Sequence, residues 1–372
     1  MRSLAAGKPP LNRALPSQRP ALSTPLRIVA IGGGTGLSTV LSGLKKYARG
    51  GPELSAGENP IVEITAIVTV SDDGGSSGRL RRDFDILPPG DIRNCMTALS
   101  EDEHLLAQLF RYRFASGRGL KGHSFGNLFL TAMHQITGDF AHAVKLSSEI
   151  LAIRGRIFPA TSSNISLEAV LEDGTLVRGE TKISKSRQPI RCIRLHPEQC
   201  TPLPEALEAI SRADLITLGP GSLYTSVIPN MLVEGIPEAI DRSPALKAYF
   251  VNLMWQPGET INFNASQHVR AIQSHAGRNI IDCVVLNTAP IPLPLQRRYA
   301  RAKVKPVEND LENLSQMGVK VVTADLMGDS DATSKKVRHN PEAVAQVAID
   351  LASRARAHQM RSRILSQRKS SR

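Results

Sequence analysis

Short apolar runs alternate along the chain with longer segments whose hydrophobic residues recur at helical spacing. The runs at 27–31, 63–70, 215–218 and 281–286 are rich in Val, Ile and Leu, which is typical of parallel strands buried on both faces. A strand, a glycine turn, a helix and a further strand together predict a βαβ unit with a right-handed crossover. The pattern therefore predicts an α/β fold, a three-layer Rossmann-like open sheet that is mostly parallel, with helices on both faces.

One stretch departs from this rhythm. Residues 165–171 alternate between apolar and polar positions, Asp173-Gly174 is a hairpin turn signal, and residues 176–183 alternate again. We therefore expect a small antiparallel β-hairpin insertion at about 156–195. The run at 190–195 is expected to be the strand at which the α/β pattern resumes.

Helical spacing is also found outside the first βαβ unit. We expect helices at 92–99, at 104–111 and at 125–151, the last of them broken near Gly138-Asp139. A final helix should begin at Pro341 and end near Arg356. The polar, turn-rich segment 71–91 is expected to be a long functional loop.

The charge of the chain lies mainly at its two ends. The formal net charge is +12, but residues 27–351 hold 35 Lys and Arg against 34 Asp and Glu. Residues 1–26 carry four basic side chains and residues 352–372 carry seven, and neither segment has an acid. We therefore expect a disordered basic extension at 1–26, a single α/β domain at 27–351, and a basic C-terminal tail at 352–372. A nearly neutral domain argues against specific nucleic-acid binding.

Cysteine usage and hydropathy place the protein in the cytoplasm. The four cysteines form no CxxC pair, so neither a zinc ribbon nor a disulfide scaffold is expected. No apolar run has the length that spans a bilayer, and prolines interrupt the N-terminal segment where a signal peptide would need its apolar stretch. We expect a cytoplasmic protein that is not transmembrane.

A glycine-rich loop follows the first strand and carries the strongest chemical signal. It consists of Gly32, Gly33, Gly34, Thr35 and Gly36. Glycines allow a phosphate to approach the backbone, and the N-terminus of the next helix offers N–H groups and a positive dipole end. The loop lacks the GK[ST] of a Walker A motif, and Leu37 stands where a dinucleotide fingerprint has its last glycine. It predicts binding of a phosphoanion and leaves a UDP-sugar and NAD open as the ligand.

Two acids follow the second strand, at the edge of the sheet where the glycine loop lies. Asp72 or Asp73 could accept ribose hydroxyls or hold Mg²⁺ against a phosphate, and since adjacent side chains diverge, we expect one of the two to face the ligand. His123, in a glycine- and serine-rich turn, is a candidate acid, base or anion donor. These three residues are the catalytic candidates.

Other polar residues stand at the starts of predicted helices and are candidate ligand contacts. They include Arg93, Asn94 and Asn127, and Gly219, Gly221 and Ser222 at a second junction between a strand and a helix. Two glycine junctions of one open sheet can frame a single crevice. Arg338, in the late sequence RHNP, suits a diphosphate or a uracil carbonyl.

Taken together, these motifs strongly resemble the bacterial gluconeogenesis-factor family, a branch of the superfamily that includes 2-phospho-L-lactate transferase. The matching stretches are IGGGTGLS (31–38), VSDDGGSSGRLR (70–81), PPGDIRNC (88–95), GHSFGNL (122–128), ITLGPGSLYTSVIPN (216–230), NLMWQPGET (252–260), RRYA (297–300) and RHNP (338–341). The resemblance implies the three-layer fold of the transferase. It also implies binding of UDP-N-acetylglucosamine, with Tyr299 and Arg338 at the positions associated with that nucleotide sugar, and a role in cell shape during gluconeogenic growth.

Two functions remain in competition at this point. One is a non-catalytic regulator that binds a UDP-sugar and passes that state to a partner protein. The other is a Mg²⁺-dependent transferase of a phospho group, similar to the 2-phospho-L-lactate enzyme, that would use Asp72 or Asp73. A third hypothesis is that the protein binds NAD. The motifs do not define a homo-oligomer, although one is compatible with them.

Overall fold

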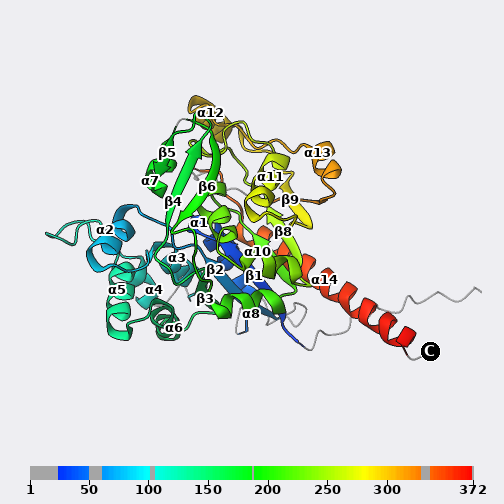
Figure 1. Cartoon of the computed structure of the whole chain (residues 1–372), viewed down its shortest axis with the longest axis horizontal. Helices are drawn as coiled ribbons and strands as arrows, with labels where there is room; N and C mark the ends of the chain where they lie inside the picture. Colours follow the sequence, from blue (N-terminus) through cyan, green and yellow to red (C-terminus); the bar gives the residue numbers. More distant parts are fainter. Residues whose placement is uncertain (1–23, 50–60, 101–104, 187, 328–335, 371–372) are drawn as a thin grey trace, which may run out of the picture.

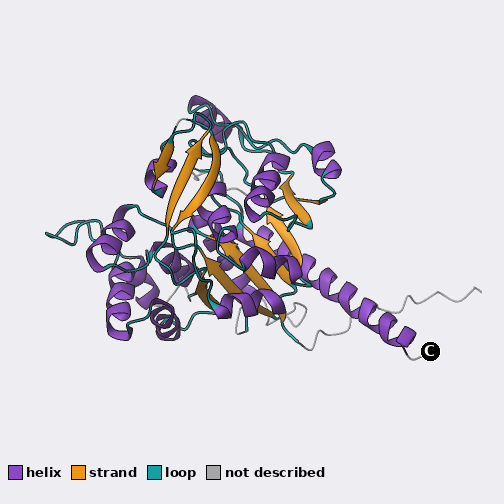
Figure 2. Ribbon diagram, viewed as in Figure 1, coloured by secondary structure: helices purple, strands orange, loops and turns teal. Residues whose placement is uncertain are grey.

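A parallel sheet forms the centre of the molecule. The computed structural model describes residues 24–49, 61–100, 105–186, 188–327 and 336–370, and within them seven strands pair in the order β10-β9-β8-β7-β1-β2-β3 (Figures 1 and 2). All six pairings are parallel. The strands are β1 (Leu26–Gly32), β2 (Val62–Val68), β3 (Arg156–Pro159), β7 (Leu215–Leu218), β8 (Leu246–Phe250), β9 (Cys283–Asn287) and β10 (Lys320–Ala324). The α/β prediction is confirmed.

Helices cover both faces of this sheet. The helix α1 (Gly34–Leu44) packs against α3 (Gly90–Leu99) and the C-terminal helix α14 (Pro341–Ser370) on one face. On the other face α8 (Pro204–Arg212) packs against α10 (Ile236–Arg242), and α9 (Ile228–Met231) against α11 (Ala265–Ala276). The remaining helices are α4 (Leu105–Arg111), α5 (Phe125–Thr137), α6 (Phe140–Ile150), α12 (Leu293–Arg301) and α13 (Leu311–Gln316). The expected break near Gly138 separates α5 from α6, because Gly138 takes a left-handed conformation with φ +70°.

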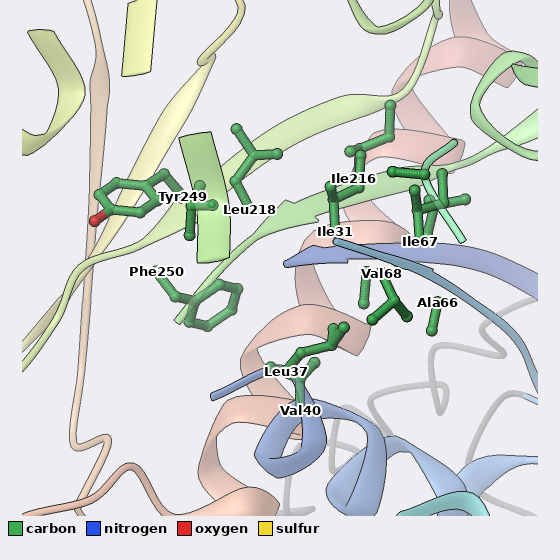
Figure 3. Close-up of a cluster of buried hydrophobic side chains, with 14 of the residues drawn as sticks. Ile31, Leu37, Val40, Ala66, Ile67, Val68, Ile216, Leu218, Tyr249 and Phe250 are labelled. Atoms are coloured by element: carbon green, nitrogen blue, oxygen red, sulfur yellow. The ribbon is translucent and has the colours of Figure 1, made fainter. Parts of the chain in front are cut away.

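The core lies between the sheet and its helices. Its side chains are the aliphatic residues of the strands and of the inner face of α1, with two aromatic rings from β8 (Figure 3). All of those labelled in the figure are at most 2% exposed: Ile31, Leu37, Val40, Ala66, Ile67, Val68, Ile216, Leu218, Tyr249 and Phe250. Burial on both faces explains why the strands read as unbroken apolar runs.

The antiparallel insertion has three strands in the order β5-β4-β6, namely β4 (Ser166–Leu171), β5 (Leu176–Arg178) and β6 (Ile190–His196). The structure differs from the sequence prediction in three respects. β3, expected inside the insertion, is the edge strand of the main sheet, because it pairs with β2. β6, expected to resume the parallel pattern, pairs with β4. The strand expected to reach residue 183 ends at Arg178, since Gly179 (φ +95°) turns the chain into the short helix α7 (Glu180–Ile183).

The segment 71–91 is not a continuous loop. It contains α2 (Gly75–Phe84), which begins at the glycine and serine run and ends at Asp85 in a left-handed conformation. Ser76, Ser77 and Gly78 are buried on this helix. A sequence rich in Gly and Ser has low intrinsic helix propensity, so packing rather than propensity decides the conformation here.

The final helix extends beyond its expected end near Arg356 and through the expected basic tail at 352–372, because α14 continues to Ser370 and projects from the body (Figure 1). Arg356, counted by its charge as part of that tail, is only 4% exposed and forms a buried ion pair with Asp214. Leu26, assigned to the N-terminal extension, is fully buried in β1. The rest of the expected extension, residues 1–23, lies outside the described residues.

No helix in the described part of the chain combines the length and the apolar character of a membrane-spanning segment.

Candidate functional site

The glycine loop lies at the carboxyl end of β1 and opens α1. Gly34 has φ +59°, a conformation that favours glycine, and it directs the chain into the first helical turn. The backbone N–H groups of that turn have no acceptor within the helix, so they can donate to an anion. Thr35 is exposed beside them. The hydroxyls of Ser38 and Thr39, in contrast, donate to carbonyls of the same helix, 3.0 and 2.9 Å away.

The second glycine junction lies against the first. A Cβ on Gly36 would fall 2.6 Å from the carbonyl carbon of Pro220 and 2.7 Å from the Cα of Gly221. Two amides hold this junction in place. The Asn252 Oδ1 accepts from the Gly221 N–H at 3.3 Å, and the Gln256 Nε2 donates to the Ser222 hydroxyl at 2.8 Å. Ser222 is therefore held by a side chain from the segment after β8 rather than capping the next helix through its hydroxyl.

One cavity of about 420 Å³ connects the two junctions with the late motifs. The residues predicted from the sequence that line it are Gly33, Gly34, Thr35, Gly36, Gly221, Ser222, Tyr299 and Arg338. The segment Asn252–Pro257, to which no role was assigned from the sequence, and His339 of the RHNP motif also line it. Residues more than 300 positions apart along the chain thus share one cavity.

Gly32 and Gly219 do not line this cavity. The carbonyl of Gly32 accepts from the Thr69 N–H at 2.9 Å, and the N–H of Gly219 donates to the Ile31 carbonyl at 3.1 Å. The backbones of both glycines therefore form hydrogen bonds at the ends of the strands that carry the loops.

The wall opposite the glycines combines an aromatic ring, a guanidinium and an imidazole. The Tyr299 hydroxyl accepts from the Val337 N–H at 3.2 Å, which fixes α12 to the segment that carries Arg338. The His339 Nε2 lies 3.2 Å from the Val251 carbonyl, and burial lowers the pKa of His339 to about 4. His339 is therefore neutral at pH 7. Because a carbonyl can only accept, Nε2 carries the proton and Nδ1 is left as an acceptor.

Asp72 and Asp73 point in different directions, as expected of neighbours in an extended loop. The Asp73 Oδ1 accepts from the backbone N–H and the hydroxyl of Thr181, at 2.9 and 2.7 Å, and so ties the loop to α7. The Asp72 Oδ1 accepts from the Gly74 N–H at 2.8 Å. A Cβ on Gly90 would lie 2.7 Å from the Asp72 Oδ2, so this oxygen faces the start of α3.

Asp91 is the carboxylate that meets the glycine loop. Its Oδ2 lies 2.7 Å from where a Cβ on Gly33 would be, and the nearby Gly34 N–H acts to lower its pKa. Burial, followed by the charge of Asp72, raises its pKa to about 6. Pro89 is the N-cap residue of α3, and Asp91 lies in the first turn of that helix.

A further carboxyl group is brought in by the antiparallel insertion. Glu180 begins α7, and burial together with the charges of Asp72 and Asp91 raises its pKa to about 9. Glu259, 6% exposed, accepts from the Tyr224 N–H at 3.0 Å, and burial raises its pKa as well. No local sequence pattern identifies Glu180 as a site residue. It follows β5, a strand of the antiparallel insertion that is far from the glycine loop along the chain.

The remaining predicted residues lie beyond Asp91, where α2, α3 and α5 begin, and do not line the cavity. The Arg93 Nη2 donates to the Asn94 Oδ1 at 2.5 Å. His123 is 5% exposed, its Nδ1 lies 2.9 Å from the Ser76 hydroxyl, and burial followed by the charge of Arg79 lowers its pKa. The Asn127 Nδ2 approaches the Ser77 hydroxyl at 3.5 Å.

The family follows from comparison with known proteins. The family model described as 2-phospho-L-lactate transferase CofD matches residues 28–327. The chain belongs to the CofD family. It is 46% identical over 327 residues to the gluconeogenesis factor of Bacillus subtilis, covering 87% of this chain and 98% of that protein. It is also 46% identical over 323 residues to the gluconeogenesis factor of Halalkalibacterium halodurans, covering 87% of this chain and 95% of that protein.

A solved structure agrees with this assignment. The crystal structure of a Bacillus halodurans protein matches with a TM-score of 0.81 and 46% identity, covering 88% of this chain and all of that one. Within the CofD family, the chain therefore groups with relatives named gluconeogenesis factor. The family match includes both glycine junctions and Asp91, whereas Arg338 and α14 lie beyond its last matched residue.

The described part of this CofD-family chain contains no preformed cluster of metal ligands. No group of three or more His, Cys, Asp or Glu side chains in the described ranges is arranged to hold a metal ion. Asp72 and Asp91 are near enough for the charge of Asp72 to raise the pKa of Asp91. A Mg²⁺ ion held there would need oxygen ligands from a bound phosphate or water, as is common for this ion.

The raised pKa of Asp91 predicts a pH-dependent stability. The folded protein retains the Asp91 proton up to about pH 6, whereas the ordinary pKa of an aspartate carboxyl, 3.8, applies to the unfolded chain. The stabilisation is complete below the lower value and is lost as the pH rises through the higher one, at a cost of about 3 kcal/mol. We expect Asp91→Asn to escape this loss, so that its free energy of unfolding relative to the wild type rises between about pH 4 and about pH 7. Urea denaturation of both proteins across this pH range measures the difference in their free energies of unfolding. A difference that does not change with pH would contradict the prediction.

Proposed function

We propose that this chain binds a UDP-sugar, UDP-N-acetylglucosamine, in the cavity between the two glycine junctions and the Tyr299–Arg338 wall. One observation carries the proposal: the anion-binding start of α1 and the later motifs line the same cavity. The glycine end suits a diphosphate, because backbone N–H groups converge there. The opposite wall offers an aromatic ring and the guanidinium of Arg338, which suit the remainder of a nucleotide sugar.

The protein acts as a regulator in this proposal, not as an enzyme. Its relatives are named gluconeogenesis factor, and the proposed role is control of cell shape during growth on gluconeogenic carbon sources. Ligand binding would be passed to a protein partner in the cytoplasm. Asp73 accepts from Thr181, the buried His123 is bonded to Ser76, and neither residue lines the cavity, which supports the absence of catalysis by these two groups.

The test is a binding experiment that also follows the ligand chemically. Purified protein is titrated by calorimetry with UDP-N-acetylglucosamine, UDP-glucose, NAD and GTP, each with and without Mg²⁺. Tight binding of UDP-N-acetylglucosamine that leaves the ligand intact supports the proposal. Binding of NAD or GTP alone would refute it.

A second function, Mg²⁺-dependent transfer of a phospho group, is favoured by one observation. Burial and the charge of Asp72 raise the pKa of Asp91, burial and the charges of Asp72 and Asp91 raise that of Glu180, and a divalent cation would relieve the repulsion among these carboxylates. Phosphorus NMR of the UDP-sugar with Mg²⁺ tests it. Turnover that is lost in Asp72→Asn would establish the transferase, and an unchanged spectrum over hours would exclude it for that ligand.

Arg338→Ala should weaken binding of the UDP-sugar. The lost interaction is a hydrogen bond from a charged donor, which typically contributes 1.5–3 kcal/mol, so we expect the Kd to rise by about 10- to 150-fold. Arg270→Ala is the matched control, because Arg270 is exposed on α11 and does not line the cavity. Equal Kd values for Arg338→Ala and the wild type would remove Arg338 from the site.

A further inference from the structure

Trp255, to which the sequence motifs assign no role, has the position and the rigidity of a binding platform. It lines the cavity, and it is the only tryptophan of the chain. Its indole Nε1 donates to the Phe263 carbonyl at 2.9 Å, and its backbone N–H donates to the Lys305 carbonyl at 2.9 Å. The ring is thus held at its edge and at its backbone, which lowers the entropic cost of stacking a ligand on it.

One face of the indole is already covered. The Lys305 ammonium lies 5.8 Å from the ring centroid, a cation–π arrangement. Lys305, unlike Trp255, is not among the residues that line the cavity. The opposite side of the ring is the part that Trp255 can offer to the cavity.

The surroundings of Trp255 suit a flat ring better than a sugar. Leu253, Met254 and Pro257 line the cavity beside it, and Trp255 and Tyr299 both pack on the small apolar cluster beneath this wall. Sugar hydroxyls need several polar partners, whereas a nucleobase needs an apolar face and a few polar groups at its edge. Arg338 and the Nδ1 of neutral His339 can supply a donor and an acceptor for such an edge.

Trp255 is also placed at a suitable position along the ligand. Asn252 and Gln256, which flank it in sequence, bond to Gly221 and Ser222 at the diphosphate end. A base on Trp255 would therefore lie close to the phosphates. From these contacts we infer that Trp255 is the stacking platform for the uracil ring of the nucleotide, an inference that rests on the proposed function and assigns one end of the ligand.

Intrinsic fluorescence tests this directly, because all tryptophan emission comes from Trp255. The wild-type protein is titrated with UDP-N-acetylglucosamine, UDP, N-acetylglucosamine 1-phosphate and pyrophosphate. We expect UDP and UDP-N-acetylglucosamine to quench the emission, and the two compounds without a base to leave it unchanged. Quenching by N-acetylglucosamine 1-phosphate but not by UDP would place the sugar on the ring and overturn the inference.

Calorimetry of two variants provides the energetic test. Trp255→Leu should weaken UDP and UDP-N-acetylglucosamine by the same factor, at least tenfold, and Trp255→Phe should weaken both less. Pyrophosphate should bind all three proteins equally, which also shows that the variants are folded. If Trp255→Leu binds UDP like the wild type, the platform is refuted while the proposed function stands. If the wild type binds no uridine compound, the proposed function fails and the inference fails with it.

Discussion

Replacing Gly36 by alanine should disrupt the packing of the two glycine junctions at the candidate site. The new Cβ would lie 2.6 Å from the carbonyl carbon of Pro220 and 2.7 Å from the Cα of Gly221, and it would be closest to the Pro220 carbonyl oxygen. These are backbone atoms, so a change of rotamer cannot relieve the contact. The two glycine junctions must move apart, and both of them line the cavity.

We expect Gly36→Ala to lose measurable affinity for the UDP-sugar and about 1–3 kcal/mol of stability, the usual cost of overpacking. Gly32→Ala is the matched control, because its Cβ would meet only the Leu37 Cβ at an ordinary 3.6 Å. Calorimetry and urea denaturation of both variants measure the effects. Ligand affinity that survives in Gly36→Ala would show that the close approach of the two loops is unimportant for binding.

Replacing Arg356 by methionine should produce the largest loss of stability. The guanidinium donates to both carboxylate oxygens of Asp214, and to the carbonyls of Thr24 and Pro25 at 2.7 and 2.5 Å. Asp214 is 5% exposed and precedes β7, and it also accepts from the Arg27 N–H at 2.7 Å. Removal of one partner leaves a buried charge without compensation, which typically costs about 3–5 kcal/mol.

This loss should be separate from ligand binding, because the pair lies at the amino ends of β1 and β7 and the glycine junctions lie at their carboxyl ends. Arg354→Met is the control, since Arg354 is exposed on the same helix. The double variant Arg356→Met with Asp214→Asn should recover part of the lost stability. Urea denaturation that finds Arg356→Met as stable as Arg354→Met would show that the pair does not anchor α14.

Much of the architecture could be predicted because its signals are local. Apolar runs of strand length predicted β1, β2 and β7, and each glycine junction follows a strand whose end it closes. Where local signals conflicted with packing, prediction failed. The glycine and serine run after Asp73 has weak helix propensity, yet it forms α2 because Ser76, Ser77 and Gly78 are buried among neighbouring helices.

The candidate site shows the same division. Glycine loops are visible in a sequence because their backbone requirement selects the residue type, and eight of the predicted residues do line one cavity. Trp255 became a candidate only when the cavity was seen. Glu180 reaches the site through α7, at the end of an antiparallel hairpin, so its approach to Asp91 depends on a contact that no spacing in the sequence encodes.

By itself, the sequence determined the α/β class, the two glycine junctions and the family resemblance, because hydrophobic periodicity and backbone-restricted residues act over a few positions. Only the tertiary structure decided which carboxylate meets the glycine loop, that Trp255 lines the cavity beside the glycine junctions, and that Arg356 belongs to the core rather than to a tail. The physical reason is that burial and pairing create the environment of a side chain. Net charge counted along the chain could not distinguish an arginine in solvent from one paired with Asp214 beneath the sheet.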